Sequence, residues 1–332
     1  MGRKINIEKI AEIAEVHPST VSRALNNSPL IQEKTRLKIQ EIARSNGYIP
    51  DAIAKSLHSG RTMIIGIIVP EISNSFYSCI IDTIEHVASQ KGYNLIISGT
   101  RFDPDAEIAA IETMISRQVD GLVVCAASNR AIDVLKTFSA HIPIVLADTI
   151  DNTPALDHVY VDECAGILSA IQYLQQHGRT RIGCIADRFT KRRLDIFTNC
   201  LTKCGLNAAP EFLDCGDSIG MECGYQGLLA LSSSHLHPDA VFAARDSLAI
   251  GIMRAAIDLK VDIPSQLAVI GYDDASIANY MYKKLSTVHQ PTDIIGESVA
   301  TLILKKLHGS SNNDESVTSI CLTPDLIIRE ST

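Results

Sequence analysis

Short apolar runs, each followed by an amphipathic stretch, recur along the chain from about residue 62 onward. Runs of this kind are typical of central strands in parallel sheets, which helices cover on both faces. The stretches between them, such as 75–92 and 105–119, space their apolar residues as helices do. The pattern predicts a doubly wound α/β architecture. The runs are 64–69, 94–98, 121–125, 143–147, 181–186, 240–244 and 267–272.

The number of these strands decides how many sheets the region needs. A region of about 270 residues with so many strands forms two sheets more easily than one. We therefore expect an α/β core of two doubly wound parallel-sheet lobes. Ligands of open α/β sheets bind beyond the carboxyl ends of the strands, so the cleft between the lobes is the expected ligand site.

The first 60 residues have helical spacing and lack such runs. Three helices are expected, within 5–16, 18–26 and 32–47. Asn6 is a plausible N-cap for the first, and Gly47 is a plausible C′ residue for the third. Only three residues separate the first two helices, which predicts a tight helix-turn-helix in an all-α head.

The second of these helices has two chemically different sides. One side supplies apolar contacts through Val21, Ala24 and Leu25, while small hydroxyls and a single arginine lie on the other. The simpler interpretation is that this helix only packs within a small helical bundle. The alternative is a helix that lies in a DNA major groove, where hydroxyls bind phosphates or base edges and arginine binds guanine.

The distribution of charge favours an anionic partner for the head. Residues 1–60 hold 9 Lys and Arg against 6 Asp and Glu, a net charge of +3, whereas the remainder has 21 against 32, or -11. The segment 51–58 that follows can form a helix of only about eight residues, which is too short to be stable alone in water. We expect that segment to be ordered only when something holds it.

Many of these segments, taken together, resemble the lactose/galactose repressor (LacI/GalR) family over about 330 residues. VHPSTVSRALNN, TRLKIQEIARSNGYIP and AIAKSL are similar to the DNA-binding head of that family. In the core, IGIIVPEISNSFYSCIIDTIE, DGLVV, IPIVLAD, VYVDECAG, PDAVFAARDSLAIG, LAVIGYDD, LSTVHQP and LIIREST follow the order and approximate spacing of the family.

The resemblance implies three parts. Residues 1–49 would form the DNA-binding domain, 50–61 a hinge helix and linker, and 62–332 an effector-binding and dimerisation domain similar to periplasmic sugar-binding proteins. The chain would cross between the lobes three times. Lobe one is expected to take about 62–161 and 291–320, and lobe two about 162–290 and 321–332.

Roles in DNA binding are carried over from the family by position. Pro18 and Ser19 occupy positions that vary with the operator sequence, and Arg23 occupies a base-contacting position. Leu57 matches a hinge leucine that wedges into the minor groove, although a leucine in a core is the simpler alternative. Positions that contact the DNA backbone are matched by Thr20, Ser22, Asn26 and Tyr48.

Four residues depart from the family pattern around the head. His17 stands where serine is usual, and Gln32 stands where a serine often caps the third helix. Glu15 replaces a usual glycine, and Asp51 replaces a frequent asparagine. The two acidic residues add negative charge close to DNA, so we expect lower non-specific affinity for DNA than in relatives.

The family's pocket positions predict an effector site in the core. A carboxylate and an arginine in a cleft can bind paired sugar hydroxyls, while an aromatic ring stacks on the sugar. Two of the positions have alternatives, since Asp273 could be a helix N-cap and Phe76 could belong to the core. The positions are Asn74, Phe76, Tyr77, Asp148, Arg193, Arg245, Asp246 and Asp273.

The run RFTKRR at 188–193 places four cations in six residues of an otherwise acidic core. Such runs are usually solvated surface. The alternative is a pocket for an anion such as a sugar phosphate, formed by Arg192, Arg193 and Arg245, the last standing where the family more often has asparagine. The effector class is therefore left open between a sugar and a sugar phosphate.

The leading hypothesis is a sequence-specific transcriptional regulator, most simply a repressor, whose affinity for DNA depends on a small effector. A homodimer is expected and not a tetramer, because LIIREST carries no leucine-heptad tail of the kind seen in some tetrameric relatives. The two-fold symmetry of a dimer predicts a pseudo-palindromic double-stranded operator. The alternatives are a solute-binding protein for transport and an enzyme with a nucleotide cofactor. Against the enzyme, no GxGxxG or GxxxxGK[ST] follows a strand.

Cofactors, metals and membranes are not expected. The longest apolar stretch, 63–70, is far shorter than the roughly 20 residues of a membrane helix, and no signal peptide is recognisable, so we expect a cytoplasmic protein. The nine cysteines contain no CxxC pair and are expected to be reduced. Cys200 and Cys204 could share a metal, but partners at zinc spacing are missing.

Overall fold

The computed structural model describes residues 5–48, 56, 60–125, 128–149, 155–206, 219–233, 237–309 and 316–332. The chain divides at Met63 into two compact units, a head and a core. Leu57, and the helix expected over 51–58 apart from Ser56, lie outside the described residues.

The head consists of the three expected helices, α1 (Ile7–Ala14), α2 (Pro18–Leu25) and α3 (Glu33–Ser45). The Asn6 side chain caps α1 by accepting a hydrogen bond of 3.0 Å from the backbone N–H of Lys9. Gly47 follows the end of α3 with φ 65°, the left-handed conformation expected of a C′ glycine. One apolar cluster holds the helices together; it contains Ile10, Ala11, Ala14, Val21, Ala24, Ile39 and Ala43.

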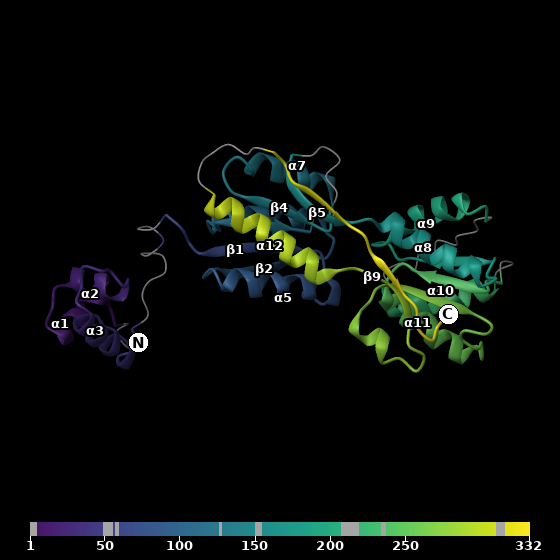
Figure 1. The fold of residues 1–332 in the computed structure, drawn as a ribbon, viewed down its shortest axis with the longest axis horizontal. Coiled ribbons are helices and arrows are strands. Elements are labelled where there is room, and N and C mark those ends of the chain that lie inside the picture. The colour runs from purple at the N-terminus through teal and green to yellow at the C-terminus, as the bar shows by residue number, and fades with distance from the viewer. Residues whose placement is uncertain are drawn as a thin grey trace. The chain divides into compact units, whose positions relative to one another are not determined.

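The core contains two sheets, as predicted (Figure 1). Lobe one has a six-stranded, entirely parallel sheet in the order β10-β5-β4-β3-β1-β2. Its strands are β1 (Ile64–Val69), β2 (Asn94–Gly99), β3 (Gly121–Val124), β4 (Ile144–Ala147), β5 (Asp157–Val161) and β10 (Ser319–Leu322). Its helices are α5 (Ser75–Ser89), α6 (Pro104–Ser116), α7 (Asn129–Phe138) and α12 (Thr292–His308).

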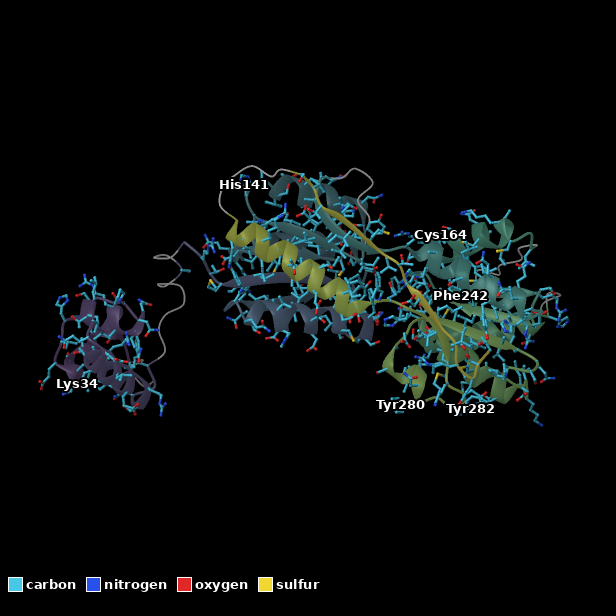
Figure 2. All side chains as sticks on the ribbon, in the orientation of Figure 1. Lys34, His141, Cys164, Phe242, Tyr280 and Tyr282 are labelled. Atoms are coloured by element: carbon cyan, nitrogen blue, oxygen red, sulfur yellow. The ribbon has the colours of Figure 1, made fainter. Side chains whose placement is uncertain are left out.

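Lobe two has a five-stranded sheet in the order β11-β9-β8-β7-β6, in which only the pair β11 and β9 is antiparallel. Its strands are β6 (Ile182–Ile185), β7 (Ala240–Ala243), β8 (Ala268–Asp273), β9 (Ser286–His289) and β11 (Asp325–Ile327). Its helices are α8 (Glu163–Gln176), α9 (Lys191–Lys203), α10 (Met221–Ser233), α11 (Asp246–Asp258) and the 3-10 turn η1 (Ser276–Asn279). Phe242 is fully buried within this lobe (Figure 2).

The chain passes between the lobes after β5, after β9 and after β10, which agrees with the expected three crossings. The yellow C-terminal segment in Figure 1 runs from lobe one into lobe two. The expected end of lobe one at 320 is slightly wrong, because β10 continues to Leu322 and pairs with β5 along that whole length. All seven predicted strands are present, while β5, β9, β10 and β11 were not predicted.

Two helices of lobe two touch at glycines. A Cβ on Gly251 of α11 would lie 1.9 Å from the carbonyl oxygen of Met221, and one on Gly224 of α10 would lie 2.0 Å from that of Leu248. Side chains at these two positions would push α10 and α11 apart, so the close crossing requires glycine at both. No helix in the described part of the chain is both long enough and apolar enough to cross a membrane.

Candidate functional site

The α2 helix presents its polar side chains to solvent and buries its apolar ones. Val21 and Ala24 are fully buried against α1 and α3, whereas Ser19, Arg23 and Asn26 are exposed. Pro18 begins the helix, where its missing N–H leaves no hydrogen bond unmade. The other predicted DNA-contacting residues in the head, Thr20, Ser22 and Tyr48, are partly exposed. The head therefore carries the exposed surface that a recognition helix needs.

His17 has a structural role that its place in the sequence did not reveal. Its Nδ1 accepts a hydrogen bond of 3.2 Å from the backbone N–H of Ser19 and lies 2.8 Å from the Ser19 hydroxyl. His17 is thus the N-cap of α2 and fixes the position of a residue predicted to select the operator. Gln32, by contrast, makes no capping hydrogen bond to α3.

A cavity of about 240 Å³ lies between the lobes of the core. Residues that follow β1, β2, β3, β4, β5, β6 and β7, and Asp273 at the end of β8, contribute to it, so both sheets point their carboxyl ends at the same space. Seven of the eight predicted effector residues line it, and Asp246 is the exception. The lining consists of Pro70, Asn74, Phe76, Tyr77, Phe102, Cys125, Asp148, Thr149, Glu163, Phe189, Thr190, Arg192, Arg193, Arg245 and Asp273.

The prediction that Asp246 contacts the effector does not fit the structure. Asp246 is almost fully buried and both of its carboxylate oxygens are occupied. Oδ1 accepts a hydrogen bond of 2.7 Å from the Thr287 hydroxyl, and Oδ2 accepts one of 2.7 Å from the backbone N–H of Ala275. Asp246 therefore holds the loop that follows β8 in place and does not face the cavity.

Arg193 is fixed by contacts on several sides. Its Nε donates to Glu163 Oε1 at 2.8 Å, and its Nη1 donates to the carbonyl of Ala244 at 2.8 Å and to Asp273 Oδ1 at 3.3 Å. The guanidinium also lies over the ring of Tyr272, 3.9 Å from the centroid. Among the described residues nothing occupies its Nη2, which leaves one edge of this rigid group for a ligand.

Asp273 faces the cavity and does not cap a helix. Its Oδ1 accepts from Arg193 and, at 2.8 Å, from the side-chain amide of Gln290, whereas the residue that precedes the turn η1 is Ala275. The alternative interpretation of Asp273 as an N-cap is therefore wrong. Burial is the main cause that raises the pKa of Asp273, and Arg193 opposes it.

Arg245 connects the two lobes. Its Nη2 donates to Asp187 on lobe two, and its Nη1 donates to Glu71 on lobe one at 3.5 Å. Its Nε is buried and has no hydrogen-bond partner among the described residues. Arg192 pairs with Glu163 at 3.3 Å and is more than half exposed. The three arginines of the predicted anion pocket do converge on the cavity, but each is paired with carboxylates.

Asp148 differs from these arginines because its carboxylate forms no ion pair among the described residues. It follows β4 with φ 53°, a left-handed conformation that is uncommon for a residue other than glycine. Burial, followed by the nearby charge of Glu163, raises its pKa to about 7. The pKa of Tyr77 is also raised, first by burial and then by Asp148, and both side chains line the cavity.

Aromatic side chains form another part of the lining. Phe76 and Tyr77 meet edge to face with centroids 5.1 Å apart, and Phe76 is 5 % exposed, so it belongs both to the core and to the cavity wall. Asn74 is the N-cap of α5 and accepts from the backbone N–H of Phe76 at 3.0 Å. Phe102 of lobe one stacks on Phe189 of lobe two, with centroids 4.0 Å apart and rings 17° from parallel.

Several lining residues were not identified from the sequence. Glu163, Phe102 and Phe189 each lie within four residues of the carboxyl end of a strand, which is the one signal that could have indicated them. Asp187 and Gln290 act by positioning Arg245 and Asp273, and such roles have no sequence signal of their own.

The described residues contain no group of three or more His, Cys, Asp or Glu side chains that could hold a metal ion. The hypothesis of a metal at Cys200 and Cys204 thus has no ligand set in that part of the chain. The Cys200 Sγ instead lies 3.6 Å from the Sγ of Cys164, and burial raises the pKa of Cys200 to about 12.

A small helical head with an exposed polar helix, joined to a two-lobed core with a polar cavity, defines a class of ligand-responsive DNA-binding proteins. Two family models match this chain: "Bacterial regulatory proteins, lacI family" over residues 6–51 and "Periplasmic binding protein-like domain" over residues 171–332. The chain belongs to the lacI family of bacterial regulatory proteins. It is a transcriptional regulator and not an enzyme.

Similar proteins agree with this assignment over nearly the whole length. The ribose operon repressor of Escherichia coli K12 is 29% identical over 306 residues, covering 91% of this chain and 92% of that protein. Catabolite control protein A of Priestia megaterium is 28% identical over 321 residues, covering 95% and 96%. A Lac repressor dimer bound to operator and the anti-inducer ONPF has the same fold, with a TM-score of 0.88, 22% identity and 99% coverage of both chains.

Proposed function

We propose that this regulator is a repressor, which binds a pseudo-palindromic operator as a homodimer and whose affinity for that operator is set by a small sugar bound between the lobes. The proposal places it in the cytoplasm, with the DNA. The observation that carries it is the pairing, in one chain, of an exposed polar α2 with an interlobe cavity lined by arginine, carboxylate and aromatic side chains.

On the head, we assign operator selection to Pro18 and Ser19 and base contact to Arg23. Ser19 and Arg23 are exposed on α2, and His17 fixes the Ser19 hydroxyl. Thr20, Ser22, Asn26 and Tyr48 would contact the DNA backbone, which fixes the register of the helix on the duplex. The wedge assigned to Leu57 remains a prediction for a residue outside the described part of the chain.

Between the lobes, a neutral sugar fits the site better than a sugar phosphate. Each arginine that lines the cavity is already paired with at least one carboxylate, so none offers an uncompensated positive charge to a phosphate. The volume of about 240 Å³ is below the roughly 300–1,000 Å³ of pockets for drug-sized ligands, which favours a ligand the size of a monosaccharide.

Control of DNA binding would follow from the geometry of the lobes. The effector contacts residues of both lobes, so its affinity differs between open and closed arrangements, and it shifts the population toward the arrangement it prefers. In a dimer this changes the separation of two hinge segments and hence of two heads.

Exposed apolar side chains on lobe two offer a surface for the second copy. Tyr280 is 83 % exposed and Tyr282 is 55 % exposed, and Figure 2 shows both at the edge of the lobe. Ile257 and Ile277 of the same lobe are also exposed. We propose that part of this surface is buried in the homodimer, because apolar side chains at subunit interfaces are removed from water.

A gel-shift selection from random palindromes at physiological salt tests the function. We expect a preferred half-site, and exchanging Pro18 and Ser19 for another pair should change the preferred bases near the half-site centre. An Arg23→Ala variant should lose preference at one base position. Binding without sequence preference would overturn the proposal.

A further inference from the structure

The cavity and its immediate partners hold more negative than positive formal charge. Three carboxylates line it, those of Asp148, Glu163 and Asp273, and two more bind its arginines from behind, those of Glu71 and Asp187. Against these five carboxylates stand the three guanidinium groups of the lining. The sum is 3 - 5 = -2 with all groups ionised, so the site lacks positive charge.

The ion pairs show where that positive charge is missing. Glu163 pairs with Arg192 and Arg193, Asp273 pairs with Arg193, and Glu71 and Asp187 pair with Arg245. Asp148 has no hydrogen-bonding or ion-pairing group at its carboxylate anywhere in the described part of the chain. The deficit is therefore largest at one partly buried carboxylate, and a carboxylate withdrawn from water in this way is stabilised by a cation or by a proton.

The surroundings of Asp148 suit a cation. Its backbone is held at φ 53°, and strained conformations of this kind persist where the surrounding structure requires a side chain in one position. Phe76 and Tyr77 line the same cavity, and aromatic rings attract cationic groups. Glu163 and Asp273 disfavour the ionised form of Asp148 and Arg193 and Arg192 favour it, yet its pKa stays raised, so a cationic ligand would stabilise the ionised form further.

A second unpartnered group indicates what the rest of the ligand must offer. Arg245 Nε is buried, its side chain is 7 % exposed, and this N–H donor has no acceptor in the part of the chain that the structure describes. The charge of Arg245 is already balanced by Glu71 and Asp187, so a neutral oxygen suffices there. A hydroxyl group meets this need without adding a negative charge.

We propose that the effector of this site is a monosaccharide-sized amine with several hydroxyl groups, such as an amino sugar, and that Asp148 binds its ammonium group. The inference rests on the proposed function and narrows its effector class. Hydroxyl groups of the ligand bind Arg245 Nε and Arg193 Nη2, and the ammonium compensates the charge that the arginines leave unbalanced.

The test compares each amino sugar with the sugar that carries a hydroxyl group at the same carbon. Isothermal titration calorimetry on the full-length protein at pH 7 would use hexoses with an amino group at C2, C3 or C6, their parent hexoses and hexose 6-phosphates. At least one amino sugar should bind about tenfold or more tightly than its parent, the effect of a hydrogen bond between charged groups.

Asp148→Asn is the decisive variant, because asparagine keeps the shape of the side chain and tolerates a left-handed backbone. It should lose most of the preference for the amino sugar while it still binds the parent sugar. Asp105→Asn removes a carboxylate from the surface of lobe one, where Asp105 pairs with Arg130, and should leave both affinities unchanged.

Parent sugars that bind as tightly as the amino sugars, a preference for the phosphates, or no binding of any amino sugar would each overturn the inference. So would an Asp148→Asn variant that keeps the preference. These outcomes leave the proposed function standing, because operator selection by the head is measured without effector. Loss of operator preference would instead contradict the proposed function, and the sugar titrations would then report on ligand binding alone.

Discussion

Asp148 brings function and stability into conflict at a single residue. Its carboxylate faces the cavity without a partner among the described residues, and its pKa of about 7 lies well above the ordinary value of 3.8, mainly because of burial. The folded protein therefore binds this proton more strongly than the unfolded chain does. The cost in folding free energy of ionising Asp148 is absent at pH values below the ordinary pKa. This cost grows as the pH rises and reaches its full size above about pH 7.

Replacing Asp148 should consequently stabilise the protein in a pH-dependent way. Asp148→Asn removes the buried charge, so its gain in free energy of unfolding should be larger at pH 8 than at pH 5 by about 1–3 kcal/mol. Urea unfolding of the two proteins without added sugar at both pH values measures this. The surface change Asp105→Asn should show no such pH dependence, and an equal gain at pH 5 and pH 8 for Asp148→Asn would contradict the assignment.

The role of a residue could be predicted where the residue occupies a known position in a motif. It could not be predicted where the role depends on contacts with neighbouring residues. Seven of the eight residues predicted from their positions in motifs line the cavity. Asp246 sits beside Arg245 in the same motif, yet the start of α11 turns it toward Thr287 and Ala275. Glu15 is a further case: it occupies the left-handed C-cap of α1 at φ 57°, which explains why glycine is the usual residue there.

At the scale of elements, α10 and α11 cross so closely that a Cβ at either glycine of the crossing would overlap the backbone of the other helix. Gly251→Ala would place a methyl carbon against the backbone of Met221, and backbone atoms cannot move aside as a flexible side chain can. We expect a loss of about 3 kcal/mol in the free energy of unfolding, at the upper end of overpacking costs.

Gly183 is the matched control for this change. A Cβ there would meet only ordinary contacts, the nearest 3.5 Å away at the Leu231 side chain. Gly183→Ala should therefore change stability by no more than about 1 kcal/mol. Thermal and urea unfolding of both variants provides the comparison, and equal stabilities would show that the helices can separate at little cost.

The stacked pair Phe102 and Phe189 joins the two lobes beside the cavity. Phe102 and Arg101 are the central residues of a turn closed by a 3.0 Å hydrogen bond from Asp103 N–H to the carbonyl of Thr100. Both have positive φ, 55° at Arg101 and 58° at Phe102, which is costly for residues other than glycine. This turn sets the ring of Phe102 against lobe two.

Phe102→Ala and Phe189→Ala should each weaken effector binding by about threefold to tenfold, because an aromatic pair of this geometry stabilises the closed arrangement of the lobes. The double variant should be little worse than either single one. Calorimetry with a bound sugar measures all four affinities, with the surface change Asp105→Asn as a control. Additive effects of the two changes would mean that the rings act separately.

The elements most visible in the sequence were the buried central strands. All seven predicted runs are strands of parallel sheets, because continuous burial leaves a continuous apolar run. The strand β5 escaped prediction because Asp157 and His158 are polar although both are buried, and β10 because it is an edge strand with alternating exposure. Pairing between residues more than 150 positions apart, as in β10 and β5, has no local signal.

For the whole molecule, the division into head and core predicts two unfolding transitions. The head has its own apolar cluster of seven buried residues, and the core has separate clusters in each lobe. In differential scanning calorimetry, a bound sugar should shift only the core transition to higher temperature. At 100 times its dissociation constant, the sugar should add about 2.7 kcal/mol to the free energy of unfolding of the core. Operator DNA should act on the head transition, and a sugar that raised both equally would indicate one cooperative unit.

The third crossing between the lobes has a consequence for the order in which the protein is made. The sheet of lobe one gains β10 and the sheet of lobe two gains β11 only when residues 319–327 have been synthesised. The head, which needs nothing beyond residue 48 for its apolar cluster, can fold on the ribosome while both lobes still lack an edge strand. During translation, a folded head thus precedes the core that is to control it.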